Sequence, residues 1–217
     1  LQGTVLLSQK KVDQAEKAFH DAIAANPQWT APYLQLARIY AATGKVDQAI
    51  EQFETIHANR PRYVPAMMTL GMLYQSQGDL EKAMEFYEKC LEVNEDFAPA
   101  ANNLAYLLIQ TGGNIDRALS LAQNARRIRP DDPGIADTLG WAFVHKKAYG
   151  SAIAQFEDAL EQMPEHPSVL YHLGVAYHRQ GQDDLALETL QKALDVGKEF
   201  PERGKVEELM KEVEKES

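Results

Sequence analysis

The chain has 217 residues, of which 45% are hydrophobic and 25% are charged, and this is a globular composition with enough apolar residues to bury a core. Its 22 basic and 32 acidic residues give a formal net charge of −10, which argues against sequence-independent binding of nucleic acid or anionic lipid, because both need a basic surface. No run of about 18 apolar residues is present, so we predict no membrane insertion in this segment.

The sequence repeats itself with a period of 34 residues. One column consists of alanines separated by 34, 34, 35, 34 and 34 residues, namely Ala15, Ala49, Ala83, Ala118, Ala152 and Ala186. A second column pairs a leucine with a small residue, at Leu36, Leu70, Leu104, Leu139 and Leu173. Prolines close four of the units, at Pro27, Pro61, Pro130 and Pro164, and Glu95 stands where a fifth would fall. A fixed period of this length predicts an array of similar units rather than one or two ordinary domains.

Each unit predicts two helices. In the third unit Met67, Leu70, Gly71 and Tyr74 stand at i, i+3, i+4 and i+7, which is the apolar stripe of a first helix. A second stripe begins after the turn residue Gly78. In chain order we predict a truncated unit at 1–29, complete units at 30–63, 64–97, 98–132, 133–166 and 167–200, and a final helix at 201–217.

The fourth and fifth units depart from the repeat pattern, and a further apolar stripe follows the last unit. The fourth unit has one extra residue in its turn, and Ala122 replaces the larger side chain of that column, so its packing is expected to be the least regular. Lys147 replaces the turn glycine of the fifth unit. At the carboxyl end, a stripe on an otherwise charged segment predicts a helix that caps the last repeat, and it consists of Val206, Leu209, Met210 and Val213.

These columns closely resemble the tetratricopeptide repeat (TPR) family, whose pattern of Leu-Gly, Tyr, Ala, Phe, Ala and Pro is matched across nearly the whole chain. The resemblance implies an all-α solenoid, in which paired antiparallel helices stack into a right-handed superhelix. The first unit starts partway through its first helix and the chain starts at Leu1 rather than Met. We therefore expect further repeats upstream.

Patterns typical of catalysis or of cofactor binding are missing from the sequence. It contains no G-x-G-x-x-G, phosphate loop, G-x-S-x-G or H-E-x-x-H, and no two histidines stand three or four residues apart. Cys90 is the only cysteine, which we interpret as a small buried residue. The basic cluster Arg126, Arg127 and Arg129 is interpreted as a helix end, with a phosphate site as the alternative. We predict a non-enzymatic chain without a catalytic residue, metal or cofactor.

The outward faces of the first helices favour partner binding. In the third unit, Met68 and Met72 lie opposite the core stripe, whereas the outward face of the second helix is charged. Exposed aromatic, methionine and arginine side chains are typical of binding surfaces. The partner-binding candidates are Arg38, Met68, Met72, Asn102, Asn103, Tyr106, Asp137, Trp141, Tyr171, His172 and Arg179. The alternative is that neighbouring first helices bury about half of these side chains, and Tyr106 and Trp141 are then expected to stay available.

The family resemblance implies that these faces line a concave groove for a protein or peptide. Members that bind chaperone tails clamp a carboxylate with lysine, asparagine and arginine. This groove has Arg38 and Arg179 but no lysine, so we predict against heat-shock chaperone tails. The runs at 102–106 and 137–141 are similar to a pairing in bacterial TPR proteins, some of which are associated with envelope assembly and exopolysaccharide export.

The sequence therefore predicts a non-enzymatic scaffold that binds an extended or helical apolar segment of a partner. Two alternatives stay open. One is a structural module that associates with itself, and the other is an accessory subunit of an envelope or polysaccharide export system. Bacterial cytoplasm and periplasm both remain compatible with a lone cysteine.

Overall fold

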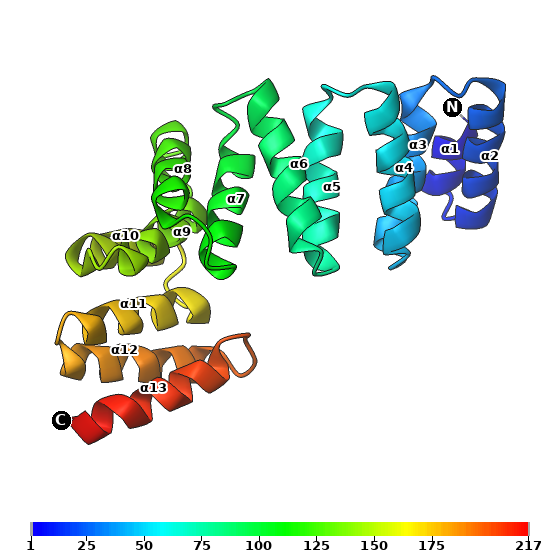
Figure 1. Ribbon diagram of the computed structural model, residues 1–217. Coiled ribbons are helices and arrows are strands. Elements are labelled where there is room, and N and C mark those ends of the chain that lie inside the picture. The colour runs from blue at the N-terminus through cyan, green and yellow to red at the C-terminus, as the bar shows by residue number, and fades with distance from the viewer. Residues whose placement is uncertain (1, 217) are drawn as a thin grey trace. The chain divides into compact units, whose positions relative to one another are not determined.

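The computed structural model describes residues 2–216, and these form thirteen α-helices and no strand (Figure 1). The all-α class predicted from the columns is confirmed. The chain divides into two units, Leu1–Glu95 and Asp96–Ser217, called here the amino-terminal and the carboxy-terminal unit. The division falls at Glu95, where the fifth proline of the repeat is missing.

The helices of each unit follow one another as antiparallel hairpins. The amino-terminal unit contains α1 (Gln2–Ser8), α2 (Val12–Ala25), α3 (Thr30–Ala42), α4 (Val46–Asn59), α5 (Val64–Ser76) and α6 (Leu80–Val93). The carboxy-terminal unit contains α7 (Ala98–Gln110), α8 (Ile115–Ile128), α9 (Pro133–His145), α10 (Tyr149–Gln162), α11 (Pro167–Arg179), α12 (Asp183–Val196) and α13 (Arg203–Glu216). The predicted limits of the individual repeats stay a prediction.

Hairpin turns depend on one residue in the left-handed region. Gly78 between α5 and α6 has a φ of +80°, and the following backbone N–H, that of Asp79, donates to Tyr74 O over 3.0 Å, which ends the first helix. Asp79 then accepts from the backbone N–H of Lys82 and so begins the second. Lys147 adopts the same conformation without being glycine, with a φ of +58°, and its side chain makes that turn more costly.

Small residues let the two helices of a hairpin approach closely. A Cβ added to Gly71 would lie 2.5 Å from Tyr87 Cε1, and one added to Gly140 would lie 2.5 Å from Phe156 Cε1. Both rings are fully buried. The column of small residues seen in the sequence is therefore the place where the aromatic ring of the second helix rests on the backbone of the first.

Tyrosines at the ends of first helices join successive hairpins. The hydroxyl of Tyr40 on α3 donates to Glu16 on α2 over 2.9 Å, and that of Tyr177 on α11 donates to Glu157 on α10 over 3.0 Å. Burial, followed by the hydrogen bond to the carboxylate, raises the pKa of each tyrosine to about 12. These bonds add polar links to the apolar contacts between hairpins.

The final helix packs against α12 and α11. Val206 and Val213 are fully buried there, as the apolar stripe predicts. Arg203 donates to Gly197 O over 2.9 Å, which satisfies a carbonyl at the end of α12. Ser168 Oγ on α11 donates to Glu202 Oε2 over 2.8 Å, just before α13 begins. The position of α13 is thus fixed at its amino-terminal end by polar contacts and along its length by two valines.

Candidate functional site

The site is built from first helices of the carboxy-terminal unit. Helices α7 and α9 contact each other, as do α9 and α11. Equivalent positions of successive repeats therefore lie side by side: Tyr106, Trp141 and Val175 belong to one such column, and Gln110, His145 and Arg179 belong to the column one turn further on. The repeat period itself brings these side chains together.

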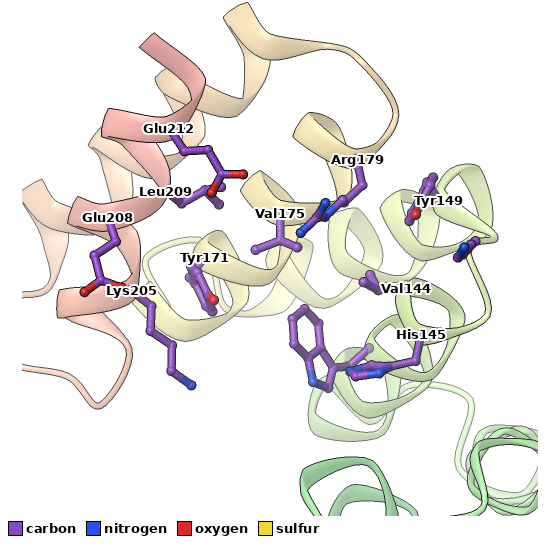
Figure 2. A pocket seen from close by; sticks show the side chains of 12 residues that line it. Val144, His145, Tyr149, Tyr171, Val175, Arg179, Lys205, Glu208, Leu209 and Glu212 are labelled. Carbon is purple, nitrogen blue, oxygen red and sulfur yellow. The ribbon is translucent and has the colours of Figure 1, made fainter. Parts of the chain in front are cut away.

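Two pockets open between these helices and α13. The larger has a volume of about 630 Å³, and Figure 2 shows Leu209 and Glu212 of α13 on one side of it, Tyr171, Val175 and Arg179 of α11 in the middle, and Val144 and His145 of α9 on the other. The smaller measures about 380 Å³ and includes Tyr106, Gln110 and Glu202 in its lining. Trp141, His145, Tyr171 and Lys205 line both pockets. The two pockets are therefore neighbours, and the three aromatic side chains that they share, Trp141, His145 and Tyr171, are called here the aromatic wall.

Trp141 is the centre of that wall. Its ring stacks on His172 with centroids 4.4 Å apart and an interplanar angle of 24°. His145 meets the same indole edge-on at 5.4 Å, and Tyr171 lies tilted at 6.4 Å. Aromatic pairs in these arrangements add to the stability that their buried area alone would give. The indole is therefore held in place before any partner arrives.

Burial keeps the wall largely uncharged. It lowers the pKa of His145, so this imidazole is neutral at pH 7. Burial, followed by the nearby Glu202, raises the pKa of Tyr106 and of Tyr171. Both hydroxyls stay protonated at neutral pH and can donate hydrogen bonds to a carbonyl group.

Charged residues line the larger pocket on two sides. Arg179 lies on α11, and Glu208 and Glu212 lie on α13 (Figure 2). Lys147, in the turn that follows α9, also lines this pocket. Within residues 2–216, neither Arg179 nor Lys205 has an ion-pair partner. Cations that stay unpaired beside an apolar wall are available to a carboxylate of a partner.

Comparison with known proteins agrees with this architecture. One family model described as tetratricopeptide repeat matches residues 29–96, and another with the same description matches residues 74–141 and 143–204. The chain belongs to the tetratricopeptide repeat family. The TPR fold is consistent with a scaffold for protein–protein interaction.

Relatives of this TPR chain include a TPR repeat-containing protein of Pseudomonas aeruginosa, 34% identical over 79 residues. That match spans 36% of this chain and only 13% of the relative. Among solved structures, YrrB, described as a TPR protein with an unusual peptide-binding site, is 23% identical with a TM-score of 0.70, covering 85% of this chain and 95% of its own.

Two other solved structures share the fold. MamA is 21% identical with a TM-score of 0.67, covering 81% of this chain and 94% of its own. A chain in the structure of the APC/C hetero-tetramer Cut9–Hcn1 is 20% identical with a TM-score of 0.73, and the match covers 97% of this chain and 41% of that one. At these identities the likeness concerns the TPR fold alone. The relation to envelope export stays a prediction.

The structure places the predicted partner-binding residues in both units. In the amino-terminal unit Arg38 is exposed on α3, Met68 is half-buried on α5, and the Met72 side chain on the same helix is 52% exposed. In the carboxy-terminal unit Tyr106 is 39% exposed. Their role in binding stays a prediction.

Other predicted residues are more enclosed. Asn102 and Asn103 are half-buried on α7, and Oδ1 of Asn102 is enclosed without a hydrogen-bond partner. His172 is only 8% exposed, and its Nδ1 lies 2.7 Å from Oδ1 of Asp137. The surface area that His172 can offer to a partner is therefore small, and its main interaction is the hydrogen bond with Asp137.

The sequence did not identify the α13 residues that line the larger pocket. Lys205, Glu208 and Glu212 lie on a face of that helix different from the buried valines. Their spacing of i, i+3 and i+7 is a signal that they share a face. It could not have shown that this face turns towards α9 and α11, because that depends on how α13 is seated on α12.

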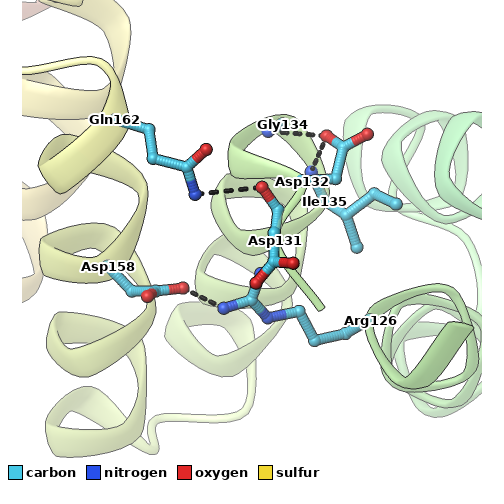
Figure 3. A network of polar contacts seen from close by, with 7 residues as sticks. All are labelled: Arg126, Asp131, Asp132, Gly134, Ile135, Asp158 and Gln162. Carbon is cyan, nitrogen blue, oxygen red and sulfur yellow. Dashed lines mark hydrogen bonds and ion pairs between the residues drawn. The ribbon is translucent and has the colours of Figure 1, made fainter. Parts of the chain in front are cut away.

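The arginine cluster is a structural feature of the carboxy-terminal unit. Arg126 pairs with Asp158 on α10, next to the bond from Gln162 to Asp131 O and to the capping bonds of Asp132 at the start of α9 (Figure 3). Arg127 lies 2.8 Å from Asp96, and Arg129 lies 3.0 Å from Asp132. Each guanidinium already has a carboxylate, which supports the interpretation of a helix end over a phosphate site.

The remaining candidates for chemistry are enclosed or dispersed. Cys90 is buried, and burial raises the pKa of its thiol to about 11, so it is protonated at neutral pH. Across residues 2–216, no three His, Cys, Asp or Glu side chains are grouped closely enough to hold a metal ion. In the same residues no helix has both the length and the apolar character to span a bilayer.

Proposed function

We propose that this chain is a non-enzymatic scaffold whose carboxy-terminal unit binds an apolar segment of a partner protein in the two pockets beside Trp141. The observation that carries the proposal is that Trp141, Tyr171 and Lys205 line both pockets, which have volumes of about 630 and 380 Å³. Volumes of this size accept one or a few side chains each.

The energetics of such a site favour a few strong contacts. Tryptophan, tyrosine and arginine are the residue types that contribute most to binding energy when they are surrounded by a rim that excludes water. Trp141 and Tyr171 are preorganised by their ring contacts, so little side-chain entropy is lost when a partner covers them. Arg179 and Lys205 then fix the orientation of the segment through its carboxylates or carbonyls.

The amino-terminal unit adds a second apolar surface in this proposal. Met72 is exposed and Met68 is half-buried on α5, and methionine adapts to side chains of different shape. Arg38 on α3 supplies a further polar group for the partner backbone in this unit, and Asn103 on α7 supplies one in the carboxy-terminal unit.

The test is a peptide-binding measurement on the purified chain. Peptides selected from a random phage-displayed library are titrated onto a Trp29→Phe variant, in which Trp141 is the one remaining tryptophan and its fluorescence reports binding. Trp141→Ala, measured with labelled peptide, is expected to weaken binding at least tenfold, as truncation of a central aromatic anchor does.

Leu185→Ala is the matched control, because Leu185 on α12 is 44% exposed and lines neither pocket. Peptides that bind the Trp141→Ala and the unmodified chain equally well contradict the proposal. Sedimentation of the free chain is the companion measurement, since a mass that rises with concentration would support self-association instead.

A further inference from the structure

A hydrogen-bonded pair lies directly beneath the aromatic wall. Asp137 on α9 and His172 on α11 meet through Oδ1 and Nδ1 at 2.7 Å, with side chains 22% and 11% exposed. The imidazole is packed between the indole of Trp141, at 4.4 Å, and the ring of Phe156, at 5.8 Å. The pair is the polar contact that crosses from α9 to α11 inside this cluster.

The carboxylate determines where the imidazole carries its proton. An ionised carboxylate can only accept hydrogen bonds, so the Nδ1–H of His172 donates to Asp137. In the neutral ring Nε2 then carries a lone pair and no proton. The fixed tautomer makes Nε2 a hydrogen-bond acceptor.

That acceptor remains reachable from the smaller pocket. His172 belongs to the lining of the 380 Å³ pocket. The fully enclosed side-chain atoms without a partner in residues 2–216 are His57 Nδ1, Asn102 Oδ1, Arg126 Nη1 and Gln155 Oε1, and Nε2 of His172 is not among them. The other polar groups of this pocket include the donors Tyr106, Tyr171 and Lys205.

We propose that Asp137 holds His172 as an acceptor for a backbone N–H of the bound segment, at the residue whose apolar side chain packs on Trp141. A peptide group has one donor and one acceptor, and the pocket offers both partners: Nε2 of His172 for the N–H, and the tyrosine hydroxyls or Lys205 for the carbonyl. The inference rests on the proposed function. Asp137 is a positioning residue, because it acts through His172.

The same unit contains a matched control. His178 and Asp183 also pair through Nδ1 and Oδ1, at 2.8 Å, but His178 lines neither pocket. Substitutions in this second pair change a similar hydrogen bond on α11 without touching the aromatic wall.

The first experiment needs no partner. Nitrogen-15 NMR of histidine-labelled full chain at about pH 8, where imidazole is ordinarily neutral, distinguishes a protonated ring nitrogen from an unprotonated one. We expect His172 to carry its proton on Nδ1 and none on Nε2, and Asp137→Asn to reduce that preference, since an amide can donate to Nδ1. A proton found on Nε2 in the unmodified chain overturns the inference.

The second experiment uses the library-selected peptides and their N-methylated versions. His172→Phe keeps a ring against Trp141 and removes the acceptor, so we expect it to weaken binding roughly three- to tenfold, the size of one hydrogen bond, while His178→Phe leaves binding unchanged. N-methylation at one peptide position should weaken binding to the unmodified chain and have no further effect on His172→Phe.

The outcomes separate the two proposals. Binding that is lost in Trp141→Ala but unchanged in His172→Phe overturns the acceptor role and leaves the proposed function standing. Binding that depends on neither residue contradicts both. If His172→Phe fails to fold, which circular dichroism shows, the NMR result and the N-methylated series on the unmodified chain decide the inference.

Discussion

The two units contain the same helical hairpin but use equivalent positions differently. On α5, Thr69 donates to Pro65 O of its own helix over 2.8 Å, and the side chain of Met72 is exposed. Two or three repeats later in the same columns, His172 reaches across to Asp137 of the neighbouring first helix, and Trp141 stacks on that histidine. Residues in the columns that face the core therefore determine the helical hairpin, which both units share. The residue types in the outward columns differ between the units and determine where a candidate site forms.

The largest effect is expected where the shared hairpin is broken. Phe156 is fully buried against Gly140, so Phe156→Ala should destabilise the carboxy-terminal unit by about 3–5 kcal/mol through lost burial and the cavity that remains. Chemical denaturation followed by Trp141 fluorescence in the Trp29→Phe background measures it. The amino-terminal unit, followed through Trp29 in a Trp141→Phe background, should change much less, and an equal change in both units would contradict the division of the chain into two units.

A smaller loss is expected when the close approach of the helices is prevented. Gly140→Ala places a Cβ 2.5 Å from the ring of Phe156, so the hairpin must open, at a cost of about 1–3 kcal/mol. Gly44→Ala is not an equivalent control, because its φ is positive, whereas Gly204→Ala has free space and tests the effect of alanine in a helix. A Gly140→Ala chain as stable as the unmodified one would show that the approach is not tight.

The tyrosine bonds predict how stability depends on alkaline pH. The folded pKa of Tyr40 and of Tyr177 is about 12, above the ordinary value of about 10, so the folded chain holds these protons more tightly than the unfolded chain does. Their contribution is complete below pH 10 and is lost as the pH rises from 10 to 12. Denaturation at a series of pH values measures the slope, which Tyr40→Phe and Tyr177→Phe should reduce; an unchanged slope contradicts the assignment.

The smallest effect is expected at the two turns without glycine. Lys10 has a φ of +60° in the amino-terminal unit and Lys147 has +58° in the carboxy-terminal unit. Replacing either with glycine removes the steric cost of a Cβ in the left-handed region, and a gain of about 0.5–1 kcal/mol remains after the entropy of glycine is subtracted. Thermal unfolding of each variant should show a gain in stability, and a loss of stability at either turn would contradict the assignment of the cost to the lysine Cβ.

The sequence predicted the features that depend on neighbouring residues. The 34-residue columns predicted the first and second helices of each hairpin, and the stripe of Val206 and Val213 predicted the buried side of α13. The outward columns also named Tyr106, Trp141 and Tyr171, which the structure brings to one pair of pockets.

The rest depends on packing between elements that are distant in the sequence. The pairing of Asp137 with His172 needs the side-by-side placement of α9 and α11, and the column alone gave both residues as direct partner contacts. The pairing of Arg126 with Asp158 requires α8 and α10 to be neighbours. Lys205 reaches the pockets because of the way α13 is seated, which no local pattern determines.

The central claim is that the wall around Trp141 contacts a foreign protein. The most direct measurement replaces either Tyr106, which lines the smaller pocket, or Leu185, which lies outside both pockets, with a photo-crosslinking residue. Each variant is irradiated once in a native lysate and once with a library-selected peptide. Mass spectrometry then identifies the crosslinked peptides. We predict adducts of the selected peptide, and of one dominant foreign protein, at position 106 and not at 185. Equal labelling at both positions, or recovery of the chain's own peptides only, would contradict the claim.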